Sequence, residues 1–166
     1  SRGLAHTNRP FPQSALEAKF SVQYCVVRAL IHGKVMLAHF EEEAYGDPVV
    51  QELLRRVSAA PYTGPAFDPD DPFDAELSLQ LADGRSLSVK VDRPLGRTTE
   101  NPIPAEMIAA KFDDCAGRVL DGETTMTVRR MIESLETLGS VRDLTTQLAR
   151  TGGRSAAEDA LRRKTA

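Results

Sequence analysis

The 166-residue chain is 41% hydrophobic and 27% charged and carries a net charge of −3. These values are those of a folded globular protein, and they exclude a disordered chain. No apolar run is long enough to span a membrane, and no basic excess favours nucleic acid, so we expect neither as a partner. The first residues hold no apolar signal core, so we expect a cytoplasmic protein.

The two cysteines, Cys25 and Cys115, each lie within an apolar helical pattern. We interpret both as reduced core residues, because no basic residue lies close enough in the sequence to activate either thiol. Zinc, phosphate-loop and dinucleotide motifs are all missing from the sequence. We therefore expect a protein that uses no metal and no cofactor.

The segment from Leu16 to Val35 is predicted to form one helix that packs from two sides. Ser14 is a suitable N-cap, Glu17 can complete a capping box, and Gly33 provides a natural end. One apolar stripe of this helix consists of Phe20, Tyr24, Val27 and Ile31.

The same helix carries polar side chains in apolar surroundings, where buried polar groups need partners. Lys19, Gln23 and Tyr24 have a spacing that makes them converge on its first turns. Two interpretations are open: these groups are satisfied by neighbouring backbone, or they line a site. Arg9, in the segment before the helix, is either a ligand for an anionic group or part of a solvated connector.

The middle of the chain contains a second helix start and a hairpin. Asp47 followed by Pro48 predicts the N-cap and first residue of a helix. Apolar and polar residues alternate over about 75–92 around Asp83 and Gly84, which predicts an antiparallel hairpin. Two strands alone are marginally stable, so we expect at least one further strand, with helices packed on one face of the sheet.

Helical patterns dominate the rest of the chain, over about 105–120, 124–138 and from Ser140 onward. The predicted fold class is therefore α+β, with one domain over residues 1–150 and a polar tail over 151–166. The buried sides of the first two of these helices are predicted to hold Met107, Ile108, Phe112, Cys115 and Val119, and then Met126, Val128, Met131, Ile132, Leu135 and Leu138.

A series of strings follows in order along the chain: NRPFP (8–12), EAKFSVQYC (17–25), ALIHG (29–33), DPVVQELLRRV (47–57), LQLADGRSLSVKVDRPLG (79–96), NPIP (101–104), AAKFDDCA (109–116) and LETLGSVRDLTTQL (135–148). Together they resemble the C-terminal domain of the MmgE/PrpD family. The resemblance covers nearly the whole chain up to about Leu148. No single string is highly specific, but the collinear set is.

This resemblance implies a lyase or a related enzyme. The family includes 2-methylcitrate dehydratases, cis-aconitate decarboxylases and iminodisuccinate epimerases, which are homodimers without an obligatory metal that act on tricarboxylates or related acids. It implies an active-site role for Tyr24, which matches the Tyr of the SxQY string, and makes Lys19, Gln23 and Arg9 candidates for substrate binding. We expect a 2-methylcitrate dehydratase-like enzyme, with a decarboxylase or an epimerase as alternatives.

The sequence also departs from the family, because the large helical domain that carries its main His, Asp and Lys residues has no counterpart here. We therefore expect a fragment that folds but does not turn over substrate alone. A non-catalytic dimerisation or interaction module is the alternative. The family's C-terminal domain normally begins with a strand just before the NRP string, and without that strand a sheet edge is free to pair with another chain. In the full-length enzyme, replacing Tyr24 by Phe is expected to lower turnover with little loss of stability.

Overall fold

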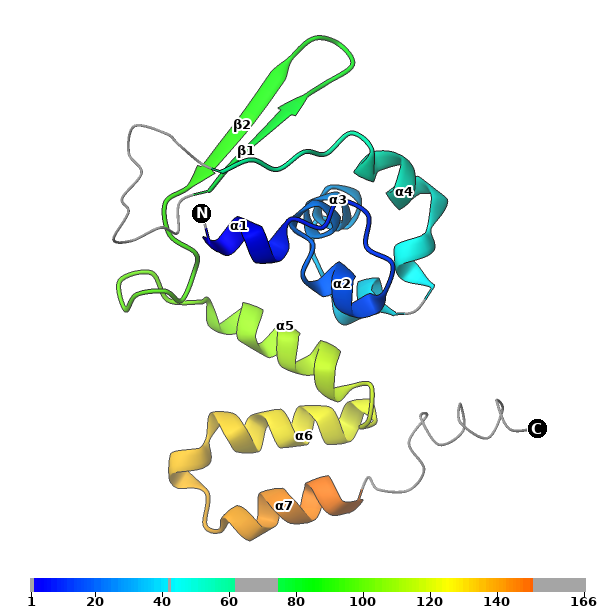
Figure 1. The fold of residues 1–166 in the computed structure, drawn as a ribbon. Coiled ribbons are helices and arrows are strands. Elements are labelled where there is room, and N and C mark those ends of the chain that lie inside the picture. The colour runs from blue at the N-terminus through cyan, green and yellow to red at the C-terminus, as the bar shows by residue number, and fades with distance from the viewer. Residues whose placement is uncertain (1, 42, 62–74, 151–166) are drawn as a thin grey trace, which may run out of the picture. The chain divides into compact units, whose positions relative to one another are not determined.

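The computed structural model describes residues 2–41, 43–61 and 75–150. Contacts divide the chain into two compact units, residues 1–103 and 104–166, and each unit is described by itself. In the described part of the chain, the first unit contains short helices and a hairpin, and the second contains helices only (Figure 1). The predicted α+β class is confirmed. The predicted polar tail, 151–166, lies outside the described residues.

The first unit begins with short helical segments, several of which are single turns. An N-cap side chain starts each of α2, α3 and α4, which explains why so short a stretch of chain holds separate helices. The segments are α1 (Arg2–Thr7), α2 (Ala15–Lys19), α3 (Val22–His32), the 3-10 helices η1 (Leu37–Phe40) and η2 (Ala44–Gly46), and α4 (Pro48–Leu54).

The predicted single helix over 16–35 is divided in two at Phe20 and Ser21. Ser21 has an extended backbone (φ −108°, ψ 110°), and its Oγ accepts a hydrogen bond from the backbone N–H of Tyr24 at 3.0 Å. A serine in this arrangement is an N-cap, so α3 begins anew after it. The one-helix prediction was therefore wrong. Its predicted end is confirmed, because Gly33 closes α3 in the left-handed region at φ 69°.

The predicted starts of α2 and α4 are confirmed. Ser14 Oγ accepts from the backbone N–H of Glu17 at 3.2 Å, and Asp47 Oδ1 accepts from that of Val49 at 2.8 Å. The Glu17 carboxylate accepts a hydrogen bond from the backbone N–H of Gln13 at 2.8 Å. The capping box is thus closed one residue earlier than in the standard arrangement.

A small apolar core holds α2, α3 and α4 together. Each residue of this core is at most 1% exposed, and α4 supplies two of them. Phe20 and Ile31, predicted to share the stripe of Tyr24, are 52% and 39% exposed; Phe20 lies outside α3, and Ile31 lies in its last turn. The core residues are Ala18, Tyr24, Val27, Val50 and Leu54, with Phe40, Tyr45, Leu53 and Val57 packed against them.

The predicted hairpin is confirmed as β1 (Ala75–Gln80) and β2 (Ser86–Val91), which pair antiparallel. Leu77 lies opposite Val89 in this register, so apolar residues share one face. Gly84 takes the left-handed conformation that the turn requires, at φ 87°.

Among the described residues, this apolar face stays exposed and lacks the predicted cover. Leu87, Val89 and Val91 are 49%, 55% and 44% exposed, and the sheet formed by the described residues has two strands and no third. Alternation in a sequence shows which face of a strand pair is apolar, but it carries no information about what packs on that face.

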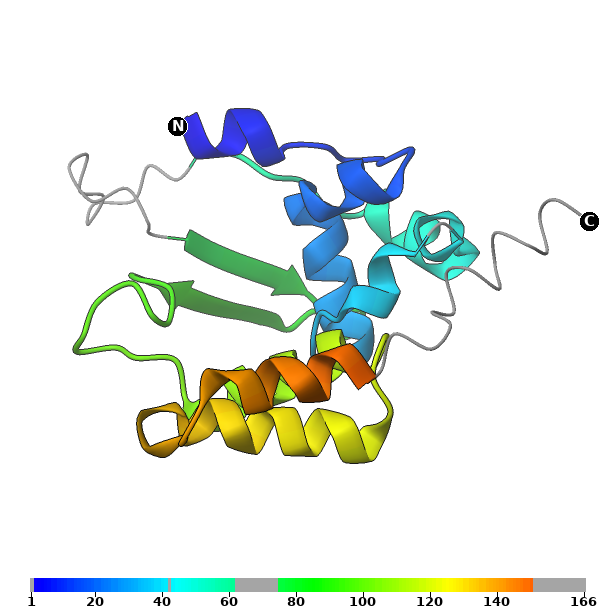
Figure 2. The ribbon, with the colours of Figure 1, turned by 90° about the horizontal axis from the view of Figure 1, so that it is seen from below.

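In the described part of the second unit, successive α-helices run in opposite directions (Figures 1 and 2). Asp121 caps the middle helix, with its Oδ1 accepting from the backbone N–H of Thr124 at 2.8 Å. Arg129 joins this helix to the preceding one through an ion pair with Asp113 at 3.1 Å. Ser140 starts the last helix, since its Oγ accepts from the backbone N–H of Arg142 at 3.2 Å. The elements are α5 (Ala105–Ala116), α6 (Gly122–Glu133), η3 (Leu135–Thr137) and α7 (Val141–Arg150).

The buried sides predicted for these helices are largely wrong. Val128 is buried as predicted, but Met107, Ile108 and Val119 are 52%, 57% and 63% exposed, and Cys115 is exposed as well. Three helices in contact bury only the stripe that each turns toward its neighbours, so apolar side chains outside that stripe stay in contact with water. In the described part of the chain, no helix is long and apolar enough to cross a membrane.

Candidate functional site

Polar groups gather at the first turn of α3, where Ser21 makes two hydrogen bonds. Its Oγ accepts from the backbone N–H of Tyr24 and donates to the backbone carbonyl of Arg9 at 2.6 Å. Ser21 is only 1% exposed, so both bonds are shielded from water. The segment that precedes α2 is thereby held across the start of α3.

Gln23 makes the second link between these segments. Its side chain is almost fully buried and its Nε2 donates to Asn8 Oδ1 at 2.6 Å, while its Oε1 has no hydrogen-bond partner within the described residues. Exchanging oxygen and nitrogen in both amides preserves this contact, because the two ends of an amide have the same shape. In the observed arrangement the atom left over is the acceptor Oε1, and only the exchanged arrangement leaves an N–H donor for a carboxylate.

The positive charges at this place come from Arg9 and Lys19, which are both exposed. The N-terminus of the 11-residue helix α3 adds the positive end of a helix dipole. Together these features suit an anionic group such as a carboxylate. Lys19 ends α2, so it does not share a helical face with Gln23 and Tyr24 as the one-helix prediction required.

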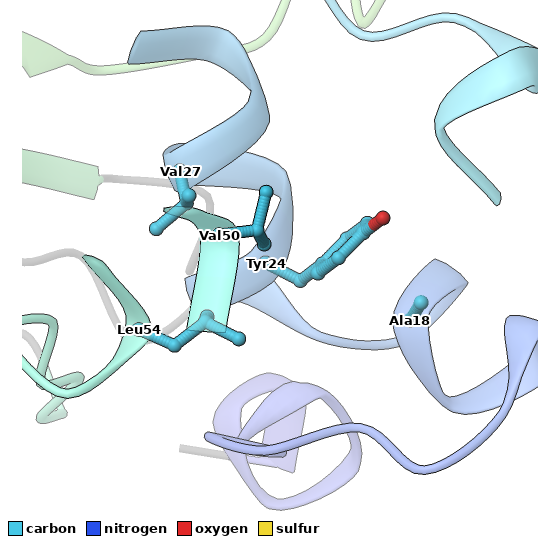
Figure 3. Packing of buried hydrophobic residues seen from close by; sticks show 5 residues of the cluster. All are labelled: Ala18, Tyr24, Val27, Val50 and Leu54. Atoms are coloured by element: carbon cyan, nitrogen blue, oxygen red, sulfur yellow. The ribbon is translucent and has the colours of Figure 1, made fainter. Parts of the chain in front are cut away.

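Tyr24 lies inside the core and has no exposed surface. Figure 3 shows its ring beside Val50, with the phenol oxygen pointing away from Val27 and Leu54. That oxygen donates a hydrogen bond to the backbone carbonyl of His39. The structure therefore separates the predicted residues, with Arg9 and Lys19 at the surface and Gln23 and Tyr24 beneath it.

Arg28 is a residue of this region that the sequence analysis missed. It is 5% exposed, its Nε donates to the Tyr24 phenol oxygen at 3.0 Å, and its guanidinium carbon lies 5.3 Å from the centre of the Tyr24 ring. Its Nη2 donates to the carbonyl of Ala44, and its Nη1 lies 3.9 Å from Asp47 Oδ2. A buried arginine needs such partners, because an unpaired buried charge is costly.

Two histidines lie beside this arginine. The rings of His32 and His39 stack with centres 4.5 Å apart, and His32 Nε2 lies 3.3 Å from Arg28 Nη1. His39 Nδ1 accepts a hydrogen bond from the backbone N–H of Met36 at 3.1 Å. Arg28 donates on the other side, so the two rings are held in place from both ends.

A signal for Arg28 was present in the sequence. It lies four residues after Tyr24, which places both on one face of a helix whose other positions are largely apolar. A charged residue on a predicted buried face needs a polar partner, and the nearest on that face is the phenol.

The cysteines add no second site. Both thiols are free, and burial raises the pKa of the half-buried Cys25, which keeps it protonated at neutral pH. Within the described residues, no group of three or more His, Cys, Asp or Glu side chains is placed to hold a metal ion.

The fold and the site define an α+β domain whose buried polar residues gather along one helix and whose exposed cations lie at the start of that helix. The chain belongs to the MmgE/PrpD family, because the model of the MmgE/PrpD C-terminal domain matches residues 1–137. This confirms the resemblance found in the sequence.

Related proteins carry the name cis-aconitate decarboxylase. The chain is 31% identical to the one from Mus musculus over 81% of its own length, and 31% identical to the one from Homo sapiens over 87%. It is 28% identical to the one from Aspergillus terreus over 80%. The chain spans between 27% and 30% of the length of these three relatives.

Proposed function

We propose that this chain is the C-terminal domain of an MmgE/PrpD lyase that removes carbon dioxide from cis-aconitate. The observation that carries the substrate class is the start of α3, where the exposed Arg9 and Lys19 lie with the positive helix end. Guanidinium, ammonium and backbone N–H groups are the usual partners of carboxylates, and a tricarboxylate needs several of them.

The names of the relatives favour decarboxylation over the dehydration expected from the sequence alone. Proteins named cis-aconitate decarboxylase match more than three quarters of this chain at about 30% identity. We therefore place 2-methylcitrate dehydration second. Both reactions need a cationic pocket for carboxylates, so the residues at the start of α3 serve either substrate.

The chemistry of cis-aconitate defines what the domain has to supply. One carboxylate is attached to a methylene group beside the carbon–carbon double bond. When its C–C bond breaks, carbon dioxide leaves and the electron pair spreads over the allylic system, which a proton must then quench at carbon. An enzyme accelerates this step by binding the remaining carboxylates with cations and by placing a proton donor near that carbon.

We assign Arg9, Lys19 and Gln23 to carboxylate binding and Tyr24 to the proton. A phenol donates a proton while its ring stays packed in an apolar core. In the structure the phenol proton is directed to the His39 carbonyl, so Tyr24 meets substrate only when that hydrogen bond opens. In this proposal, the remaining acid and base groups come from the part of the enzyme that matches the relatives outside this domain.

A non-catalytic interaction module is the second candidate, and the hairpin favours it. The exposed apolar face of β1 and β2 is the kind of surface that a partner covers. The proposals differ in what they require of the start of α3, because a module needs no carboxylate site there.

The experiment is a substrate comparison with the product of the complete reading frame that encodes this chain. We expect carbon dioxide release from cis-aconitate and a kcat/KM for 2-methylcitrate dehydration at least about 100-fold lower, which corresponds to roughly 2.7 kcal/mol of transition-state discrimination. If dehydration of 2-methylcitrate is the faster reaction, the proposed function changes from decarboxylase to dehydratase. A folded product with neither activity would support the interaction module.

A further inference from the structure

The phenol oxygen of Tyr24 has two hydrogen-bond partners, Arg28 and the backbone of His39. Arginine carries only donors, so the phenol oxygen accepts the Nε–H of Arg28 at 3.0 Å. The carbonyl of His39 only accepts, so the single phenol proton is directed to it. The bond from Arg28 is buried and that to His39 is partly buried, and Tyr24 itself has no exposed surface, so water has little access to the phenol oxygen.

The guanidinium of Arg28 is itself fixed in position. Its Nη2 donates to the Ala44 carbonyl, and its Nη1 faces His32 Nε2 at 3.3 Å and Asp47 Oδ2 at 3.9 Å. Asp47 in turn is held by capping α4, through the backbone N–H of Val49. The arginine is therefore held by groups on three sides, which leaves its Nε–H directed at Tyr24.

We propose that Arg28 is a positioning residue that acts through Tyr24. It orients the phenol in the resting domain, and it stabilises the phenolate that forms when Tyr24 gives its proton to carbon. This inference rests on the proposed function for its catalytic part.

The step balances without another reactant. The O–H bond of Tyr24 breaks and a C–H bond forms with the electron pair left by departing carbon dioxide, so the negative charge moves from carbon to the phenol oxygen. Arg28 Nε–H already points at that oxygen, and a hydrogen bond from a cation to an anion is stronger than one to a neutral phenol. Water later returns the proton to Tyr24.

Arg28 does not touch substrate in this account, which separates it from the cations at the surface. Its side chain is 6% exposed, whereas Arg9 and Lys19 are exposed. Removing Arg28 should therefore lower kcat and leave KM unchanged, and removing the surface cations should raise KM.

The first test needs no activity. The 166-residue chain is labelled with carbon-13 at the tyrosine ring carbon that bears the hydroxyl, and hydroxyl exchange is read from the splitting of that signal in mixed light and heavy water. We expect slow exchange at Tyr24 in the wild-type chain and in the exposed control Arg55→Gln, and at least tenfold faster exchange in Arg28→Gln. Unchanged exchange in a folded Arg28→Gln chain would overturn the proposal.

Two further variants cover the case in which Arg28→Gln does not fold. Arg28→Lys keeps the charge but loses the Nε geometry, so exchange should again rise. In Tyr24→Phe, the Arg28 Nε–H loses its acceptor and should exchange at least tenfold faster than in the wild-type chain. Unchanged exchange in both variants would overturn the proposal.

The catalytic part is tested with the complete reading frame. We expect Arg28→Gln to lower kcat for cis-aconitate by at least tenfold with KM within twofold of wild type, Arg28→Lys to recover part of that loss, and Arg55→Gln to match wild type. A folded Arg28→Gln enzyme with unchanged kcat would limit Arg28 to a structural role. If the exchange results are as expected but neither the wild type nor any variant releases carbon dioxide from cis-aconitate, the proposed function fails while the positioning of Tyr24 by Arg28 stands.

Discussion

Replacing Tyr24 by Phe removes one oxygen and two buried hydrogen bonds. The phenol donates to the His39 carbonyl and accepts from Arg28 Nε at 3.0 Å, and Phe fills the same space without either bond. A neutral buried hydrogen bond contributes about 1 kcal/mol and one to a charged group about 1.5–3 kcal/mol, so we expect the free energy of unfolding to fall by roughly 2–4 kcal/mol. The sequence alone suggested little loss of stability, whereas the two hydrogen bonds of the phenol lead us to expect a larger one.

The assay is equilibrium unfolding of the 166-residue chain in urea, followed by circular dichroism. With a slope of about 2 kcal/mol per molar urea, the midpoint of Tyr24→Phe should fall by roughly 1–2 M. Tyr45→Phe is the matched control, because Tyr45 is only partly buried, and its midpoint should move by less than about 0.3 M, equal to roughly 0.5 kcal/mol. Equal midpoints for wild type and Tyr24→Phe would refute the assignment of the phenol oxygen to two buried partners.

Other predictions concern the start of α3 and the cap of α6. In the enzyme made from the complete reading frame, Arg9→Gln and Lys19→Gln should each raise KM for cis-aconitate about tenfold, or roughly 1.4 kcal/mol, because each removes a charge from the ground-state complex. Lys34→Gln is an exposed control and should match wild type. Equal KM values in all three variants would remove both cations from the site. Ser21→Ala should lower the free energy of unfolding by about 1–3 kcal/mol, since it removes the cap of α3 and the donor to the Arg9 carbonyl, and unchanged thermal unfolding would contradict this. Hydrogen bonds from the backbone and side chain of Thr124 lower the pKa of Asp121. The stabilisation of α6 by this carboxylate is therefore fully present above the unfolded-state pKa of about 3.9 and is lost as the pH falls through the folded-state pKa. In Asp121→Asn, this acid-dependent loss of stability should vanish from the unfolding of the second unit, and a pH dependence identical to that of wild type would contradict the prediction.

Local signals in the sequence predicted the hairpin and two helix starts. Asp83 and Gly84 together with strict alternation specify the turn and the paired strands, and Asp47 before Pro48 specifies the start of α4. These features depend on backbone preferences within a few residues, so they can be derived from the chain alone.

Features that depend on distant partners were harder to predict. Apolar periodicity favoured one helix through Phe20 and Ser21, because periodicity counts apolar residues and gives no weight to a serine that caps a helix. Val89 and Ile108 lie on apolar faces that were predicted to be buried, and both are exposed. A pattern shows which face is apolar but carries no information about what covers it.

The candidate site was predicted in part. Gln23 and Tyr24 were identified as polar groups in apolar surroundings, and both are buried. The partner of Gln23 is Asn8, fifteen residues away, and that of Tyr24 includes the backbone of His39, also fifteen residues away. Such pairs arise from folding of the chain back on itself, which no helical spacing encodes.

The most direct measurement of the central claim is a titration of the nitrogen-15-labelled chain with cis-aconitate, with amide shifts recorded against sodium chloride at matched ionic strength. We predict saturable shifts at Arg9, Ser21 and Gln23, together with the Gln23 side-chain amide, and none at Val89 in the hairpin. Shifts identical to those caused by the salt, or saturable shifts confined to the hairpin, would contradict a carboxylate site at the start of α3.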